Sequence, residues 1–158
     1  MADDREILTW ELFGRASREL ATRIARDGFR PDAIVAIARG GLTLAGVLGY
    51  ALDVKMLGSL NVEFYTGVGE TLVAPVVLPP TLDQESLAGK SILLVDDVAD
   101  SGRTLSLVLQ LLQAGGGEVR TVCLYAKSHS VQEPDYVWRR TDSWILFPWS
   151  SEGAVAYP

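Results

Sequence analysis

The segment 91–104 places the tightest limit on what this chain can fold into. Its first part, 92–95, is a continuous apolar run, which is typical of a strand buried on both faces. Apolar residues then recur at helical spacing in 105–112, which indicates an amphipathic helix. The intervening residues, 96–104, are mostly polar and include three aspartates. The segment therefore predicts a buried strand, a polar loop and a helix, the unit from which parallel α/β sheets are built.

Similar units occupy much of the remaining chain. The apolar run 34–38 is followed by glycines and a helical stretch to about Leu52, and 119–126 supplies another strand. Thr9 stands at the N-cap position of a helix whose apolar residues share one face until Gly28. This alternation of strand and helix predicts an α/β fold with a mostly parallel, twisted sheet flanked by helices.

Three further segments complete the predicted fold. Residues 54–65 and 73–78 are β-prone and would add strands, with a mobile loop or hairpin tip at 66–71 between them. Residues 135–149 are aromatic and β-prone, and we expect a small separate lobe there. At 158 residues, of which 48% are apolar, the chain fits a single domain, 1–158, that can bury a core of its own.

Charge and cysteine content narrow the class of partner. The net charge of −6 argues against a general nucleic-acid surface, which needs clustered lysine and arginine. No apolar run reaches the ~18 residues of a membrane span, and the acidic N-terminus does not resemble a signal peptide. The only cysteine, Cys123, lies in an apolar strand and should act as a small hydrophobe. We therefore expect a cytoplasmic protein that binds small molecules, and neither nucleic acid nor membrane.

The loop after the 92–95 strand carries the candidate chemistry. Residues 100–104 offer successive backbone N–H groups, two hydroxyls and a helix N-terminus, which suit a phosphate monoester. The adjacent Asp96 and Asp97 repel each other unless a metal ion, ligand hydroxyls or basic groups intervene. An Asp-rich turn with a helix cap would explain either feature alone, but the joint pattern favours a ligand site. Neither a Walker loop nor a dinucleotide-binding glycine fingerprint is present in the sequence.

The segment 94–104 resembles the 5-phosphoribosyl-1-pyrophosphate-binding motif of the type I phosphoribosyltransferases. Residues 38–42 look like the pyrophosphate loop of that family, and 135–149 look like the hood of its xanthine-guanine members. Archaeal-type hypoxanthine and xanthine members look most similar. The resemblance implies the type I phosphoribosyltransferase fold, with its core at about 30–130 and a small C-terminal and N-terminal hood at about 131–150.

The resemblance also implies roles for residues on the sugar-phosphate side. Asp96 and Asp97 would hold the ribose hydroxyls and, indirectly through these hydroxyls or water, a Mg²⁺ ion. Asp100 would be the catalytic base near purine N7, and its backbone would contact the 5′-phosphate. The remaining 5′-phosphate-binding residues would be Ser101, Gly102, Arg103 and Thr104. Arg103 is bulkier than the residue that the family often carries at this place.

Other residues would bind the pyrophosphate and the base. Arg39 and Gly40 would face the pyrophosphate, across a non-proline cis peptide bond after Ala38. The purine-binding residues would be Lys127 at the exocyclic O6, Trp144 stacked on the ring and Ile145 through its backbone groups. His129, the only histidine, has no metal-ligating companions and is expected to be a loop residue without a catalytic role.

Together these implications predict a purine salvage enzyme that transfers phosphoribosyl from 5-phosphoribosyl-1-pyrophosphate to a 6-oxopurine, with Mg²⁺, and releases pyrophosphate. The base could be hypoxanthine, guanine or xanthine. The resemblance suggests a homodimer or a higher homo-oligomer. The two glycines in the polar segment 66–71 lead us to expect a loop that closes over the site and excludes water. Two alternatives stay open: a non-catalytic regulator that senses the same phosphoribosyl ligand or a nucleotide, and a phosphoribosyltransferase for another base.

Overall fold

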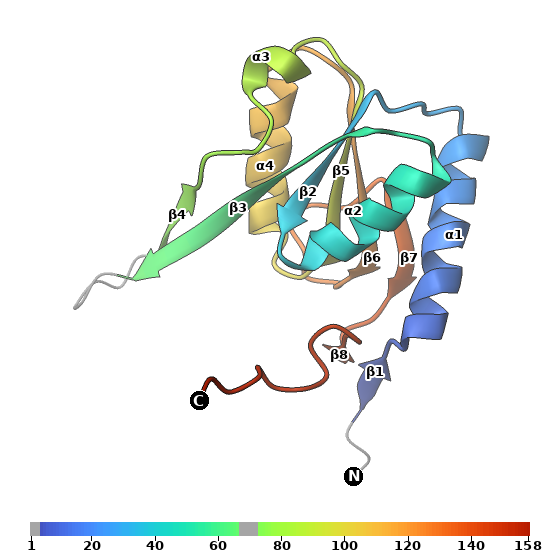
Figure 1. The fold of residues 1–158 in the computed structure, drawn as a ribbon, viewed down its shortest axis with the longest axis vertical. Helices are drawn as coiled ribbons and strands as arrows, with labels where there is room; N and C mark the ends of the chain where they lie inside the picture. The colour runs from blue at the N-terminus through green and yellow to red at the C-terminus, as the bar shows by residue number, and fades with distance from the viewer. Residues whose placement is uncertain (1–3, 67–72) are drawn as a thin grey trace.

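The computed structural model describes residues 4–66 and 73–158, and helices cover both faces of its larger sheet (Figure 1). The helices of these residues are α1 (Trp10–Arg26), α2 (Gly40–Ala51), α3 (Gln84–Leu87) and α4 (Arg103–Gln113). The strands are β1 (Arg5–Ile7), β2 (Ala33–Ala38), β3 (Met56–Thr66), β4 (Val73–Val77), β5 (Ile92–Ala99), β6 (Val119–Ala126), β7 (Tyr136–Arg140) and β8 (Trp144–Leu146). The loop predicted at 66–71 lies, after its first residue, outside the described residues.

Six strands form the main sheet in the order β4-β3-β2-β5-β6-β7. Neighbouring strands are parallel except for β3 and β4, which form an antiparallel pair at one edge. Helices α1 and α2 pack on one face of this sheet, and α3 and α4 pack on the other (Figure 1). The predicted α/β fold, a mostly parallel sheet flanked by helices, is confirmed.

The central strands supply side chains to both faces of the sheet. In β2, Ile34 and Ala36 belong to the core beneath α1 and α2, whereas Val35 and Ile37 belong to the core beneath α3 and α4. All four side chains are buried. Because burial on both faces requires apolar residues at every position, β2 reads as a continuous apolar run. The same burial holds the carboxyl end of the strand in place, next to the first turn of α2.

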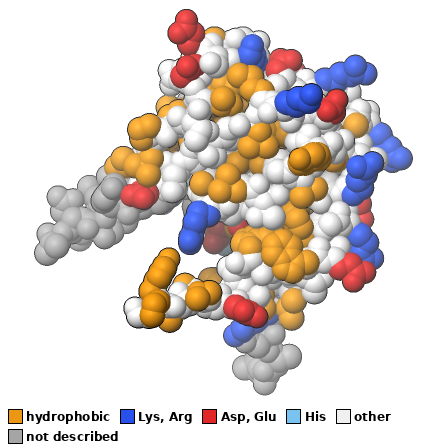
Figure 2. Space-filling model, in the orientation of Figure 1, with side chains coloured by type: hydrophobic (Ala, Val, Ile, Leu, Met, Phe, Trp, Pro, Cys, Tyr) orange, Lys and Arg blue, Asp and Glu red, His pale blue; other side chains and the backbone are white. Residues whose placement is uncertain are grey.

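Helix α1 forms as predicted. The Oγ1 atom of Thr9 accepts a hydrogen bond from the Leu12 N–H at 3.1 Å, which caps the first turn. Phe13, Leu20 and Ile24 lie on the buried face and join the hydrophobic core between α1, α2 and the sheet. The outer face carries charged residues, and Figure 2 shows Lys and Arg side chains along the side where α1 runs.

The C-terminal tail is arranged differently from the prediction. Strand β7, which the sequence places in a small lobe, is the edge strand of the main sheet and pairs in parallel with β6. The hydroxyl of Tyr136 donates to Asp27 at 2.7 Å and accepts from Arg120 at 2.8 Å, which fixes the start of β7. Strand β8, in contrast, leaves the main sheet and pairs with β1. A β-prone pattern shows which face a residue occupies but not which strand it pairs with.

Smaller differences follow from local geometry. Residues 54–65 supply most of one long strand, β3, and β5 continues past its apolar run to Ala99. Helix α3 has four residues, too few for a periodic pattern, and sequence analysis missed it. Within 4–66 and 73–158, no helix combines the length and the apolar composition that crossing a membrane requires.

Candidate functional site

The carboxyl ends of β2 and β5 meet at one edge of the sheet, because the two strands are parallel neighbours. A cavity of about 270 Å³ lies there, against the first turn of α2 and the loop before α4. Its lining includes seven of the predicted site residues: Gly40, Asp96, Asp97, Asp100, Ser101, Gly102 and Thr104. The location agrees with the general rule that open α/β sheets bind ligands at the carboxyl ends of their strands.

Asp96 and Asp97 form a half-buried pair of carboxylates in β5. The Asp96 carboxylate accepts a hydrogen bond from the Asp97 N–H at 2.9 Å, and the Asp97 carboxylate accepts one from the Val98 N–H at 2.8 Å. Burial raises the pKa of Asp96 well above its usual range, and the neighbouring Asp97 charge raises it further. Burial also raises the pKa of Asp97. The pair is therefore electrostatically suited to a ligand that brings hydroxyl donors or a cation.

The described residues do not supply a complete metal site by themselves. No group of three or more His, Cys, Asp or Glu side chains in 4–66 and 73–158 could hold a metal ion. Neither Asp96 nor Asp97 forms an ion pair with a described Lys or Arg. An ion at this place would therefore need ligand oxygens or water for most of its coordination, as Mg²⁺ commonly does beside phosphates.

The first turn of α2 lies directly against this pair. The peptide bond between Ala38 and Arg39 is cis, as the resemblance implies. A Cβ atom on Gly40 would lie closer than 3.0 Å to the Asp97 carboxylate, and one on Gly41 would lie equally close to the Val95 carbonyl oxygen. Glycine is required at both positions because real Cβ atoms essentially never approach other atoms so closely. The Arg39 side chain is exposed and does not line the cavity.

The loop before α4 has the geometry of a phosphate cradle. Gly102 has a φ of +78°, and it immediately precedes Arg103, the first residue of α4. Ser101 and Thr104 line the cavity, and the Ser101 hydroxyl accepts a hydrogen bond from the Arg103 N–H at 3.3 Å. Arg103 itself is exposed and lies outside the cavity lining. Backbone donors, hydroxyls and the positive end of the α4 dipole thus converge on one spot.

His129 lies on the turn after β6 and contacts this loop, a placement that sequence analysis did not predict. Its Nε2 atom is 2.9 Å from Oδ1 of Asp100. The two residues are 29 positions apart, and they meet because β5 and β6 are parallel neighbours that end together, with Ala99 opposite Ala126. A contact between residues that follow adjacent parallel strands could have been anticipated only after the strand order was known.

The predicted purine-binding residues gather beside the cavity but not in its lining. The Lys127 N–H donates to the Ala99 carbonyl at 2.9 Å, which joins the ends of β6 and β5. The Lys127 Nζ atom donates to the carbonyl oxygen of Ser143, the residue before Trp144. Trp144 is 73% exposed, although a tryptophan in a β-prone segment is more often part of the core. Ile145 follows it, half-buried, opposite β1.

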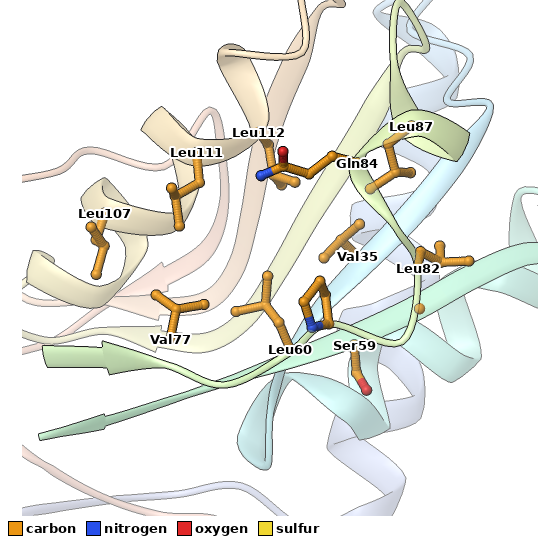
Figure 3. Close-up of a pocket in the computed structure, with 12 residues that line it drawn as sticks. Val35, Ser59, Leu60, Val77, Leu82, Gln84, Leu87, Leu107, Leu111 and Leu112 are labelled. Atoms are coloured by element: carbon orange, nitrogen blue, oxygen red, sulfur yellow. The ribbon is translucent and has the colours of Figure 1, made fainter.

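A second cavity, of about 360 Å³, lies between α4, α3 and the β3–β4 edge of the sheet (Figure 3). Figure 3 shows Leu60, Val77, Leu107, Leu111 and Leu112 around it. Its lining contains no charged residue. A phosphorylated ligand would lose its hydration there without gaining ionic or backbone donors, so the strand-end cavity is the better candidate site.

The strand-end cavity, with its aspartate pair and the loop 100–104 before α4, belongs to an α/β protein whose candidate site suits a phosphorylated sugar. The chain matches the family model of the phosphoribosyl transferase domain over residues 4–153, and it belongs to this family. The sequence-based prediction of a phosphoribosyltransferase is thereby confirmed.

Individual relatives agree with this assignment. The xanthine-guanine phosphoribosyltransferase of Gluconobacter oxydans is 34% identical over 146 residues, which cover 91% of this chain and 83% of the relative. Among solved structures, a purine phosphoribosyltransferase from Pyrococcus horikoshii is 35% identical, with a TM-score of 0.83 and coverage of 98% and 99%. A hypothetical protein from Neisseria gonorrhoeae with bound ppGpp is 25% identical, with a TM-score of 0.79 and coverage of 95% and 91%.

Proposed function

We propose that this protein is a purine salvage phosphoribosyltransferase. It transfers phosphoribosyl from 5-phosphoribosyl-1-pyrophosphate to a 6-oxopurine and releases pyrophosphate. One observation carries the proposal: the aspartate pair and the phosphate loop line one cavity, and Lys127 and the exposed Trp144 lie at the adjoining strand end. Relatives described as xanthine-guanine and purine phosphoribosyltransferases support the choice of base.

The sugar phosphate is held by two groups of residues. The carboxylates of Asp96 and Asp97 accept hydrogen bonds from the two ribose hydroxyls, which removes part of the mutual repulsion of the pair. The 5′-phosphate lies on the loop 100–104, where backbone N–H groups, the Ser101 and Thr104 hydroxyls and the α4 N-terminus donate to its oxygens. Arg103, exposed and outside the cavity, contributes its backbone N–H and not its guanidinium.

The leaving pyrophosphate lies beside the first turn of α2. The backbone of Gly40 lines the cavity there, and the Arg39 guanidinium swings in from the exposed side to neutralise charge. Asp96 and Asp97 fit an ion that is held mostly by the ligand, because both are half-buried carboxylates without a described cationic partner. Bound with the pyrophosphate, Mg²⁺ supplies positive charge to the leaving group.

Proton transfer belongs to Asp100. Purine N9 forms a bond to the anomeric carbon while the bond to pyrophosphate breaks, and the proton on N7 passes to the Asp100 carboxylate. Lys127 donates to the purine O6 and keeps its bond to Ser143, since an ammonium group has three donors. Trp144 stacks on the ring, and the backbone of Ile145 faces the C2 edge. A lysine donor opposite O6 disfavours adenine, whose amino group cannot accept this bond.

The cellular setting and the assembly are part of the proposal. A cytoplasmic location is supported by the buried, unpaired thiol of Cys123 and by the phosphorylated substrate. A homodimer or higher homo-oligomer is supported by α2, which leaves Leu42, Val47 and Tyr50 exposed. Sedimentation velocity tests the assembly, since a purely monomeric protein at micromolar concentration would contradict it.

The deciding experiment measures pyrophosphate release from 5-phosphoribosyl-1-pyrophosphate and Mg²⁺ with hypoxanthine, guanine, xanthine, adenine and uracil. We expect release with at least one 6-oxopurine and none with adenine or uracil. In the Asp100→Asn variant, kcat should fall by about 10²–10⁴, the usual contribution of a general base, while the phosphoribosyl ligand still binds. The sequence-based alternative is a nucleotide-sensing regulator, and the one observation on its side is the ppGpp bound to the similar protein from Neisseria gonorrhoeae. If no base led to pyrophosphate release while calorimetry still showed binding of 5-phosphoribosyl-1-pyrophosphate, the result would favour the regulator.

A further inference from the structure

We propose that His129 is a positioning residue that holds the Asp100 carboxylate in the orientation in which it takes the purine proton. The inference rests on the proposed function, in which Asp100 is the general base. It gives a role to the only histidine of the chain, a residue that sequence analysis left without one.

Asp100 needs such a partner because its side chain is otherwise unconstrained. The carboxylate is 67% exposed, and within the described residues the one hydrogen bond that it accepts comes from His129, at 2.9 Å. An exposed aspartate exchanges among staggered rotamers, whereas a general base must stay within ~2.6–3.2 Å of the proton that it removes. The bond from His129 engages Oδ1 and leaves Oδ2 for the substrate.

The chemistry of the two groups fixes the direction of this hydrogen bond. An ionised carboxylate can only accept, so Nε2 of His129 carries the hydrogen and donates it to Asp100. A ring nitrogen that already carries hydrogen cannot take up the proton that Asp100 removes from the purine. At this contact His129 therefore acts through Asp100, and its Nε2 atom is not a second base.

The turn that carries His129 is fastened to the phosphate loop. The Val131 N–H donates to the Ser101 carbonyl at 2.9 Å. A Cβ atom on Gly102 would lie closer than 3.0 Å to Ser130 and to the Val131 backbone nitrogen, so the two segments pack without a gap. The backbones on both sides of the His129–Asp100 bond are thus held together independently of the bond itself.

The same turn is also fastened on its other side. The N–H and the hydroxyl of Ser128 each donate to Asp142 at 2.8 Å, and these two bonds lower the pKa of Asp142. The charges of His129 and Lys127 lower it further. Lys127 begins this turn, and its carbonyl accepts from the Ser130 N–H at 3.2 Å. One short turn therefore positions both Lys127, which is proposed to donate to the purine O6, and His129, which is proposed to orient Asp100.

Steady-state kinetics of three variants test the role. His129→Leu keeps similar bulk but cannot donate, and kcat should fall by roughly threefold to tenfold, since the lost bond involves a charged but exposed group. The KM for 5-phosphoribosyl-1-pyrophosphate should stay within about twofold, because the phosphate loop keeps its own backbone contacts. His129→Gln offers an amide N–H at a similar reach and should restore most of kcat.

A matched control comes from the same turn. Val131→Ala trims a side chain that is 71% exposed and keeps the backbone bond to Ser101, so its kinetics should equal those of the wild type. A His129→Leu variant with wild-type kcat would overturn the proposal. A His129→Gln variant as slow as His129→Leu would also overturn it, because it would show that the ring and not the donated hydrogen bond matters.

A double-mutant cycle separates positioning from a purely structural effect. In the Asp100→Asn background the base is absent, so adding His129→Leu should lower kcat no further. An additional loss of the same size as in the wild-type background would overturn the proposal.

The outcomes also separate the proposed function from the positioning role of His129. A wild-type protein that binds the phosphoribosyl ligand but processes no base contradicts the proposed function, whereas an active enzyme indifferent to His129 contradicts the positioning role alone.

Discussion

Gly40 and Asp97 approach each other so closely that a Cβ atom on Gly40 would lie within 3.0 Å of the Asp97 carboxylate. Gly40 is the first residue of α2, and Asp97 lies near the carboxyl end of β5. The contact places the positive end of the α2 dipole beside a carboxyl group whose pKa burial raises. The proposed pyrophosphate site and the proposed ribose site therefore share one wall, and a change on either side affects both.

The first prediction concerns the contact between Gly40 and Asp97. Gly40→Ala should weaken binding of 5-phosphoribosyl-1-pyrophosphate at least about tenfold, because the new methyl group displaces the Asp97 carboxylate. Gly46→Ala is the matched control in the same helix, since nothing lies within 4 Å of its added Cβ. This control should leave binding unchanged and stabilise the protein by ~0.5–1 kcal/mol. Calorimetric titration and urea unfolding measure both effects, and equal binding by the two variants would contradict the prediction.

The second prediction concerns the stability of the ligand-free protein. Asp96→Asn removes a half-buried charge next to Asp97 while keeping an oxygen that accepts from the Asp97 N–H. At pH 7 the free energy of unfolding should rise by about 1 kcal/mol, a common size for a single stabilising substitution, whereas affinity for the phosphoribosyl ligand should fall.

The difference in free energy of unfolding between Asp96→Asn and the wild type should depend on pH, because the pKa of Asp96 is raised in the folded state. A carboxyl group whose pKa is higher in the folded state destabilises the fold above its unfolded pKa, which is ~3.9 for Asp. As pH falls through the raised pKa toward ~4, folded Asp96 takes up a proton and the wild type recovers stability. The advantage of Asp96→Asn should therefore shrink between pH 7 and pH 4. Urea unfolding across this range provides the measurement, and a difference that is constant with pH would be incompatible with this cause.

Sequence reasoning predicted the parts of the candidate site that are local in the chain. The β5 strand, its aspartates and the phosphate loop are contiguous, and burial on both faces gives β5 a readable pattern. The position of Tyr136 in the main sheet could not be predicted, because the β-prone pattern around it does not indicate that its strand pairs with β6. His129 was missed for a similar reason: its contact with Asp100 exists only through the pairing of β5 with β6. What could not be predicted from the sequence was the long-range pairing of strands, whereas the local β-propensity of these segments was predicted correctly.

The third prediction concerns the exposed ring of Trp144, which is proposed to stack on the purine. Trp144→Leu should raise the KM for the base by about tenfold, because stacking on an aromatic ring contributes ~1–3 kcal/mol per base. The free energy of unfolding should change by less than ~0.5 kcal/mol, since the side chain is 73% exposed. Base-dependent kinetics and urea unfolding supply the two readouts.

Trp10→Leu is the matched control for that substitution. Trp10 is also largely exposed, but its ring lies 6.1 Å from those of Phe13 and Trp149. Its removal should therefore lower stability and leave the KM for the base unchanged. If both variants lost stability and neither changed the KM, Trp144 would be a packing residue like Trp10.

The last prediction compares two glycines that share a φ of +78°. Alanine at Gly28, where nothing lies within 4 Å of the new Cβ, should cost only the ~1–2 kcal/mol of a left-handed L-residue. Alanine at Gly102 meets the same backbone cost and also drives its Cβ into Ser130 and the Gln132 backbone nitrogen. Gly102→Ala should therefore destabilise the protein by a further ~1–3 kcal/mol and weaken phosphoribosyl binding, which Gly28→Ala leaves intact. Equal losses of stability with unchanged binding would mean that the loop can part from the His129 turn, and that its close packing does not shape the phosphate site.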